Sequence, residues 1–272
     1  MNWRAIGAII RKDTTVVLRS KAVLLPLILV PVLLQVIIPA GLGASVNFIP
    51  QGSSEVEDLV QMLQAMPPGL QDQLSALNER QLFLTLMLVY MFAPFFLIVP
   101  LMVSSVIAAD SFVGEKERKT LEALLHSAIT NRELLTGKML TAWLPAVAIS
   151  WGCFVLYGVV VNAVGWPIMG RIFFPNAMWL VLVFWVAPAV SGLGLSITVL
   201  ISSRVKTFQE AYQMGGMVVL PVVALVIGQV AGVLYLSVGF AFVLGLGAWL
   251  LDAALLWFGA RTFRRENLLA QL

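Results

Sequence analysis

The feature that most constrains this chain is a series of long stretches without a charged residue. The first, 22–46, has 25 residues and contains no Asp, Glu, Lys or Arg. About 20 residues of α-helix cross the roughly 30 Å hydrocarbon core of a bilayer, whereas the apolar core of a signal peptide has only about 7–15 residues. With 60% apolar and 11% charged residues, the chain also lies outside the composition of soluble domains. The sequence therefore predicts an all-α integral membrane protein.

The uncharged stretches predict six transmembrane helices within a single domain, residues 1–272. The last stretch, 211–260, has 50 residues with Asp252 as its one charged residue, which is too long for a single tilted helix. We therefore place two helices in it, with a turn between Gly228 and Gly239. The expected spans are about 22–46, 81–109, 139–164, 177–202, 211–231 and 239–260.

The distribution of basic residues predicts the orientation. Cytoplasmic segments of membrane proteins are rich in Lys and Arg, and 15 of the 17 such residues fall at the ends and in the connections on one side. Only Arg80 and Arg171 fall on the other side, so we expect both termini in the cytoplasm. The net charge of +3 then reflects orientation and not nucleic-acid binding. Residues 1–21 combine five basic residues with apolar residues at helical spacing, which predicts an amphipathic helix on the membrane surface.

The segment 110–138, between spans 2 and 3, holds 10 of the 31 Asp, Glu, Lys and Arg residues. Its first half has three leucines on one helical face, Leu121, Leu124 and Leu125. Further along, Thr130 and Glu133 fit a capping box, in which each side chain accepts a hydrogen bond from the other residue's backbone N–H. We expect two short helices here. Spacing alone leaves open whether the leucines bind a partner or dip into the lipid headgroups below a solvated run of charges.

Three motifs resemble the signature of ABC-2 type transporter permeases, the membrane subunits of ATP-driven exporters. The first comprises Asp110, Gly114-Glu115-Lys116-Glu117-Arg118, Thr120-Leu121-Glu122, Leu124-Leu125 and Gly137-Lys138. The second begins at Ser202-Ser203-Arg204, and the third is the tail from Phe263 to Leu269. The resemblance implies a multi-pass permease of a prokaryotic cytoplasmic membrane, which works as a dimer with a second copy or a related chain.

The resemblance also implies a role for the segment 110–138. In such permeases the loop between spans 2 and 3 is a coupling helix that docks on a separate ATP-binding subunit, with two of these subunits in each complex. The residues implied at this interface are Glu115, Glu117, Arg118, Thr120, Leu121, Glu122, Leu124 and Leu125. The chain would then form the translocation path and receive force through this loop.

We expect no catalytic, cofactor or metal site in this chain. A G-x-x-x-x-G-K-[ST] phosphate loop is absent, because Gly137-Lys138 is followed by Met139 and has no glycine five residues before it. ATP and Mg²⁺ are therefore expected on the partner subunit. The sole histidine, His126, cannot form a metal cluster, and the protease motifs H-E-x-x-H and G-x-S-x-G are absent.

Asp252 is a possible polar site within the membrane. An ionised acid at the centre of a transmembrane helix costs about 2.5–3.5 kcal/mol, so Asp252 either serves a polar path or is a structural acid bonded to a neighbouring helix. A secondary transporter, which should carry several buried ionisable residues near mid-membrane, is an alternative function. A membrane subunit that senses or regulates without transport is another. The sequence does not indicate the transported substrate.

Overall fold

The computed structural model describes residues 2–46, 68–118, 130–202, 204–205 and 207–262. Within these ranges the secondary structure is helical, without a strand, and six helices are long and apolar enough to cross a membrane. The predicted all-α membrane fold with six spans is confirmed. The predicted turn between spans 5 and 6 is confirmed as well, because the first of these helices ends at Val230 and the next begins at Val238.

We number the six membrane-crossing helices as spans 1–6, several of which are interrupted by π-helical or 3-10 turns. Span 1 comprises α2 (Lys21–Val32), η1 (Leu33–Ile37) and α3 (Ile38–Ser45). Span 2 comprises α6 (Glu79–Leu84), η3 (Thr85–Met91), α7 (Ala93–Phe96), α8 (Ile98–Ala109), η4 (Asp110–Gly114) and α9 (Glu115–Glu117). Span 3 is α11 (Asn131–Met169), and span 4 comprises α12 (Ala177–Val181), η5 (Leu182–Val186) and α13 (Ala187–Ser202). Span 5 comprises α14 (Phe208–Gly216), η6 (Met217–Val219) and α15 (Leu220–Val230), and span 6 is α16 (Val238–Thr262). Two further helices are α1 (Trp3–Arg19) and α5 (Pro68–Leu74).

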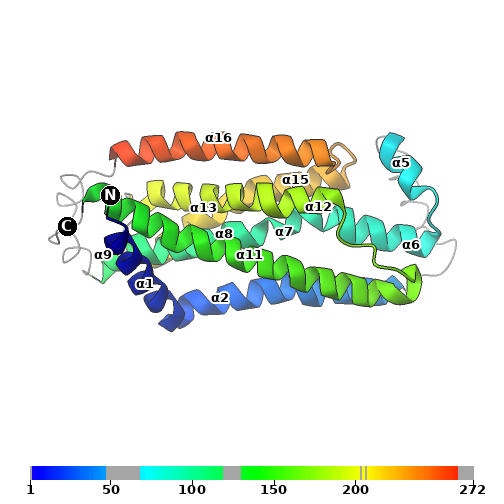
Figure 1. Ribbon diagram of the computed structural model, residues 1–272, viewed down its shortest axis with the longest axis horizontal. Helices are drawn as coiled ribbons and strands as arrows, with labels where there is room; N and C mark the ends of the chain where they lie inside the picture. The colour runs from blue at the N-terminus through cyan, green and yellow to red at the C-terminus, as the bar shows by residue number, and fades with distance from the viewer. Residues whose placement is uncertain (1, 47–67, 119–129, 203, 206, 263–272) are drawn as a thin grey trace.

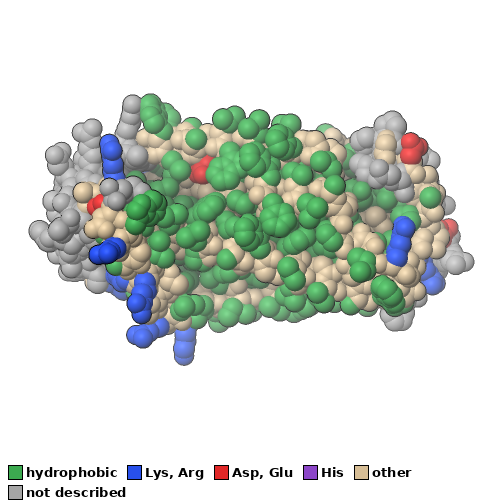
Figure 2. All heavy atoms as spheres, in the orientation of Figure 1, with side chains coloured by type: hydrophobic (Ala, Val, Ile, Leu, Met, Phe, Trp, Pro, Cys, Tyr) green, Lys and Arg blue, Asp and Glu red, His purple; other side chains and the backbone are tan. Residues whose placement is uncertain are grey.

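The spans run along the long axis of the molecule, and α1 crosses one end of the bundle (Figure 1). This end also holds α9, the first turns of α11 and the last turns of α16 (Figure 1). We call it the basic end, because Lys and Arg side chains gather there (Figure 2). They include Arg4, Arg11, Lys12, Arg19 and Lys21 from α1 and the start of α2. The helices α5 and α6 lie at the opposite end (Figure 1).

Spans 2 and 4 form the centre of the bundle. In the most apolar 18-residue stretch of spans 2 and 4, 61% and 67% of the residues are buried, against 22–33% in the same stretch of the other four spans. The helices α8 and α13 pack along each other, where Gly194 leaves room for the chain opposite. A Cβ atom at Gly194 would lie 2.7 Å from the Leu101 carbonyl oxygen, too close for an ordinary contact. The more exposed apolar faces of the outer spans therefore remain to face lipid.

The helix boundaries around the predicted loop 110–138 differ from expectation. The span 2 helix continues through Asp110 to Glu117, and the span 3 helix already begins at Asn131. The sequence placed the ends of the spans at charged residues, but the buried charges of Asp110, Glu115 and Lys138 are paired within the protein and so permit the helices to continue.

Side chains of three other spans hold the half of span 2 that lies away from the basic end. The π-helical turn η3 presents three successive carbonyl oxygens, at 88, 89 and 90, to donors from outside its own helix. The Tyr157 hydroxyl of α11 donates to the first, and the indole N–H of Trp179 on α12 donates to the second at 2.7 Å. The amide group of Gln229 on α15 donates to the third at 3.2 Å. Spans 3, 4 and 5 are thereby each hydrogen-bonded to one turn of span 2.

Candidate functional site

At the basic end, a lysine is fully buried among acidic and hydroxyl groups. Lys138, near the start of α11, has 0% of its surface exposed. Its ammonium group donates to the Glu115 carboxylate and to the Ser111 carbonyl oxygen. It also lies 3.3 Å from the Ser111 hydroxyl and 3.7 Å from the Asp13 carboxylate. Together with Lys12, these residues form what we call the charge cluster.

Lys12 completes the charge cluster from its exposed side. Its ammonium group pairs with the Glu115 carboxylate and lies 3.3 Å from Asp13, so two cations face two carboxylates. Burial lowers the pKa of Lys12, but the hydrogen bond and charge of Glu115, with the charge of Asp13, outweigh this effect and raise the pKa above its ordinary value. Lys12 therefore remains charged throughout the physiological pH range.

The charge cluster joins three separate elements. α1 contributes Lys12 and Asp13, the end of span 2 contributes Ser111 and Glu115, and α11 contributes Lys138. The Ser111 hydroxyl donates to the Asp13 carboxylate at 2.8 Å, which adds a direct bond between α1 and span 2. Desolvating a charge costs several kcal/mol, so these groups are stable in the interior only as long as all of them are paired.

The packing of α1 against α11 brings the charges together. Ile6, Ile9, Asp13 and Val17 recur at helical spacing and form the buried face of α1. A Cβ atom at Gly137 would lie 3.0 Å from the Ile9 side chain, so glycine at this position lets the two helices approach closely. The buried face of α1 is thus covered by protein, whereas its basic residues remain exposed together with Trp3 and Leu18.

A second ion pair fixes the point where span 2 ends. The Arg118 guanidinium lies 3.0 Å from the Asp110 carboxylate, eight residues earlier in the chain. It passes over Gly114, where a Cβ atom would lie 2.9 Å from the Asp110 carboxylate and 3.1 Å from the guanidinium. Glycine therefore makes room for this pair, which holds the chain as it leaves the helix.

The chain is held again where it enters α11. Thr130 and Glu133 form the predicted capping box, which is confirmed. The same Glu133 carboxylate also accepts a hydrogen bond from the backbone N–H of Asn2, just before α1. On the side of span 2, the Glu117 carboxylate accepts a hydrogen bond from the Phe208 N–H at 2.8 Å, at the start of α14. Both ends of the segment 119–129 are therefore tied to neighbouring elements.

The residues predicted for a partner interface divide into two groups. Glu115 is buried in the charge cluster, whereas Glu117 and Arg118 are exposed at the end of span 2. Thr120, Leu121, Glu122, Leu124 and Leu125 lie outside the described residues. Glu115 is therefore buried and not available to a partner at the surface, and the interface itself stays a prediction.

Asp252, the predicted polar site in span 6, lies in a different part of the molecule. Its carboxylate is buried and accepts a hydrogen bond from the Ser196 hydroxyl of α13. It covers Gly192, where a Cβ atom would collide with the carboxylate oxygens. This arrangement corresponds to an acid bonded to a neighbouring helix, the structural one of the two roles considered for it.

Sequence reasoning did not identify the roles of Asp13, Ser111 and Lys138. Lys138 stood within the recognised motif, and Asp13 is the only acid among the first 21 residues, in line with Ile6, Ile9 and Val17 on the apolar face. An acid on the apolar face of a helix indicates a buried cation elsewhere, but the sequence alone does not say which one.

Comparison with known proteins identifies the family. A family model described as ABC-2 family transporter protein matches residues 7–268. The chain belongs to the ABC-2 transporter family. No curated protein matches the sequence. As a family member with six apolar helices, the ABC-2 protein is a multi-pass membrane protein and the permease component of an ABC transporter, a class that works with ATP-binding subunits.

Proposed function

We propose that this ABC-2 protein is the permease subunit of an ATP-driven exporter of a prokaryotic cytoplasmic membrane. Two copies, or this chain and a related one, form the translocation path. Two separate subunits bind ATP and Mg²⁺ and dock on the segment between spans 2 and 3. The chain itself catalyses no reaction, and it converts movement of its partner into movement of the spans.

The charge cluster is the observation that supports this proposal most directly. Two of its members, Glu115 and Lys138, flank the segment 119–129 in the sequence. The cluster joins α1, span 2 and span 3 through groups that are stable only when paired. A displacement of this segment is therefore passed to three elements together. The bond from Glu117 to the start of α14 adds span 5 to the set.

The distribution of charge supports the proposed orientation. The basic end carries α1, the end of span 2, the start of span 3 and the last turns of span 6 (Figure 1), and 15 of the 17 basic residues fall on this side of the predicted topology. Since Lys and Arg are retained on the cytoplasmic side, the docking segment faces the compartment that contains ATP.

The test is to co-express the chain with its ATP-binding subunit and to measure both copurification and ATPase activity. Leu121→Asp/Leu124→Asp puts two charges on the face proposed to dock, and we expect it to abolish copurification while the permease still folds. Leu18→Asp, at an exposed leucine of α1, is the matched control and should retain the partner. If the double variant copurifies with as much ATPase as the unmodified chain, this coupling assignment is wrong.

A further inference from the structure

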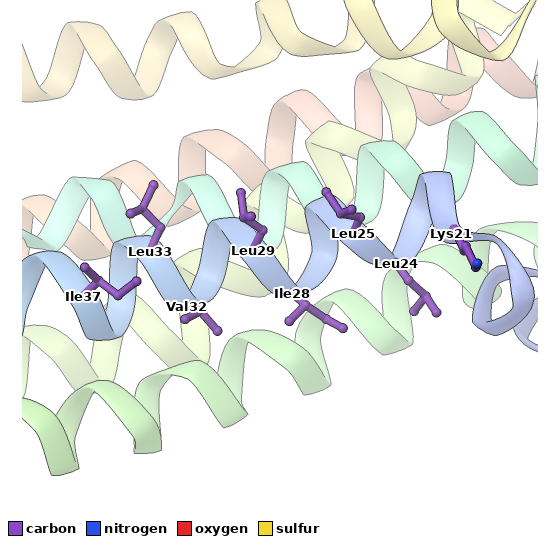
Figure 3. Close-up of a pocket in the computed structure, with 8 residues that line it drawn as sticks. All are labelled: Lys21, Leu24, Leu25, Ile28, Leu29, Val32, Leu33 and Ile37. Carbon is purple, nitrogen blue, oxygen red and sulfur yellow. The ribbon is translucent and has the colours of Figure 1, made fainter.

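Span 1 carries an exposed apolar groove that begins at a basic residue. Figure 3 shows its eight lining residues projecting from one continuous stretch of helix. One row, at intervals of four residues, consists of Lys21, Leu25, Leu29, Leu33 and Ile37. The second row consists of Leu24, Ile28 and Val32. Rows of side chains at this spacing form ridges along a helix, with a groove between them, and here the groove has a volume of about 600 Å³.

The groove is long enough to hold a lipid chain of one leaflet. From Lys21 to Ile37 the helix rises roughly 24 Å, at about 1.5 Å per residue. Half of a hydrocarbon core measures roughly 15 Å, so the groove extends from the membrane surface to beyond the midplane. All lining residues except Lys21 are aliphatic, which suits an acyl chain and excludes a polar ligand along this length.

The mouth of the groove is positively charged and lacks a protein counter-ion. Arg19 and Lys21 flank the corner between α1 and α2, and both are exposed. In the described part of the chain, neither of them takes part in an ion pair. The sequence contains no Asp or Glu from Thr14 to Val46, so no acid of the adjoining chain neutralises this corner.

We infer that this groove binds one acidic phospholipid of the leaflet at the basic end. The phosphate and the negative headgroup lie on Lys21 and Arg19, and one acyl chain lies between the two rows of span 1. This inference requires only that the chain spans a membrane, and it does not depend on the proposed docking of an ATP-binding subunit.

A second copy of the chain fits this groove less well. Two copies related by a twofold axis along the membrane normal have the same residues at the same depth. A contact between α2 and its symmetry mate would therefore bring Lys21 and Arg19 close to their own counterparts, without an acid among the neighbouring residues of α2. An anionic lipid removes this repulsion.

The test is a photo-crosslink from the groove in nanodiscs that contain equal amounts of phosphatidylglycerol and phosphatidylcholine. Benzoylphenylalanine in place of Leu29 captures whatever occupies the groove, and mass spectrometry identifies the adduct. Because each basic residue near a membrane surface favours acidic lipid by about fivefold, we expect phosphatidylglycerol adducts to exceed phosphatidylcholine adducts by at least about fivefold. The double change Arg19→Gln/Lys21→Gln should bring the ratio close to one.

Two controls make the result specific. Benzoylphenylalanine in place of Val159, which is exposed on α11 to a similar extent as Leu29, should capture the two lipids in nearly equal amounts. Arg4→Gln removes a basic residue from the other end of α1 and should leave the ratio at Leu29 unchanged. Equal capture of both lipids at Leu29, or adducts formed mainly with a second copy of the chain, would overturn the inference.

Discussion

Lys138 is a charged side chain without solvent contact, and its stability depends on its partners. With Lys12 it balances the charges of Asp13 and Glu115, and its ammonium group lies 5.3 Å from the centre of the Phe112 ring. A cation over an aromatic face gains further attraction. Removing one member of such a group leaves a buried charge unpaired, whereas removing a matched pair does not.

This difference can be measured with Lys138→Met. The variant leaves two carboxylates facing Lys12 alone, and we expect the free energy of unfolding to fall by about 3–5 kcal/mol. Lys138→Met/Asp13→Asn restores the balance of one cation and one carboxylate, so the double variant should be more stable than the single one. Unfolding by titration with sodium dodecyl sulfate reports both values, with the exposed Arg204→Met as control. A double variant less stable than the single one would contradict the charge-balance argument.

Asp252 allows a second prediction about a single residue. Asparagine at this position retains an oxygen that can accept the Ser196 hydroxyl, so Asp252→Asn should keep both stability and ATPase activity of the complex near the unmodified values. Asp252→Leu removes the acceptor, and we expect a loss of about 1 kcal/mol in the free energy of unfolding. A stable Asp252→Asn variant without ATPase activity would instead assign Asp252 to a polar path.

Among the elements, the π-helical turn η3 is hydrogen-bonded to three other spans. Its three bonded carbonyl oxygens connect span 2 to spans 3, 4 and 5 through Tyr157, Trp179 and Gln229. The half of span 2 away from the basic end is thereby braced by polar bonds, and its other end is braced by the charge cluster. Movement transmitted along span 2 therefore reaches its neighbours at two separate levels.

The bond from Tyr157 can be removed with little change in shape. Tyr157→Phe should lower the free energy of unfolding by about 0.6 kcal/mol, and by no more than about 1.7 kcal/mol, the range found for hydrogen bonds between membrane helices. Tyr212→Phe on α14 is the control, because the Tyr212 side chain is 40% exposed. Titration with sodium dodecyl sulfate measures both. An equal effect of the two changes would show that the bond to η3 does not stabilise the bundle.

The elements also show what the sequence could and could not predict. The spans follow from runs of apolar residues, and the capping box at Thr130 follows from a local pattern. The continuation of the span 2 helix from Asp110 to Glu117 could not be predicted from such local patterns, because it depends on cations that lie elsewhere in the chain. Asp13 and Lys138 are 125 positions apart, and no spacing rule links residues at such a distance.

At the scale of the whole molecule, the proposed orientation predicts which sites are accessible from outside the cell. Arg171 follows the end of α11 and is exposed, and Arg204 is exposed between spans 4 and 5. A membrane-impermeant maleimide should label Arg171→Cys in intact cells, but should label Arg204→Cys only after permeabilisation. The native Cys153 is buried, so labelling of the unmodified chain gives the background signal. The reverse pattern of labelling would invert the topology.

The two anchored ends of the segment 119–129 have a thermodynamic consequence for any partner that binds it. A loop with fixed ends has fewer conformations available than a free chain of the same length. A partner that orders this segment therefore removes less conformational entropy on binding, and more of the contact energy remains as affinity. Replacing the buried Asp110, which breaks its pair with Arg118, or removing the Thr130 cap would weaken docking in this way without altering a residue predicted at the surface of contact.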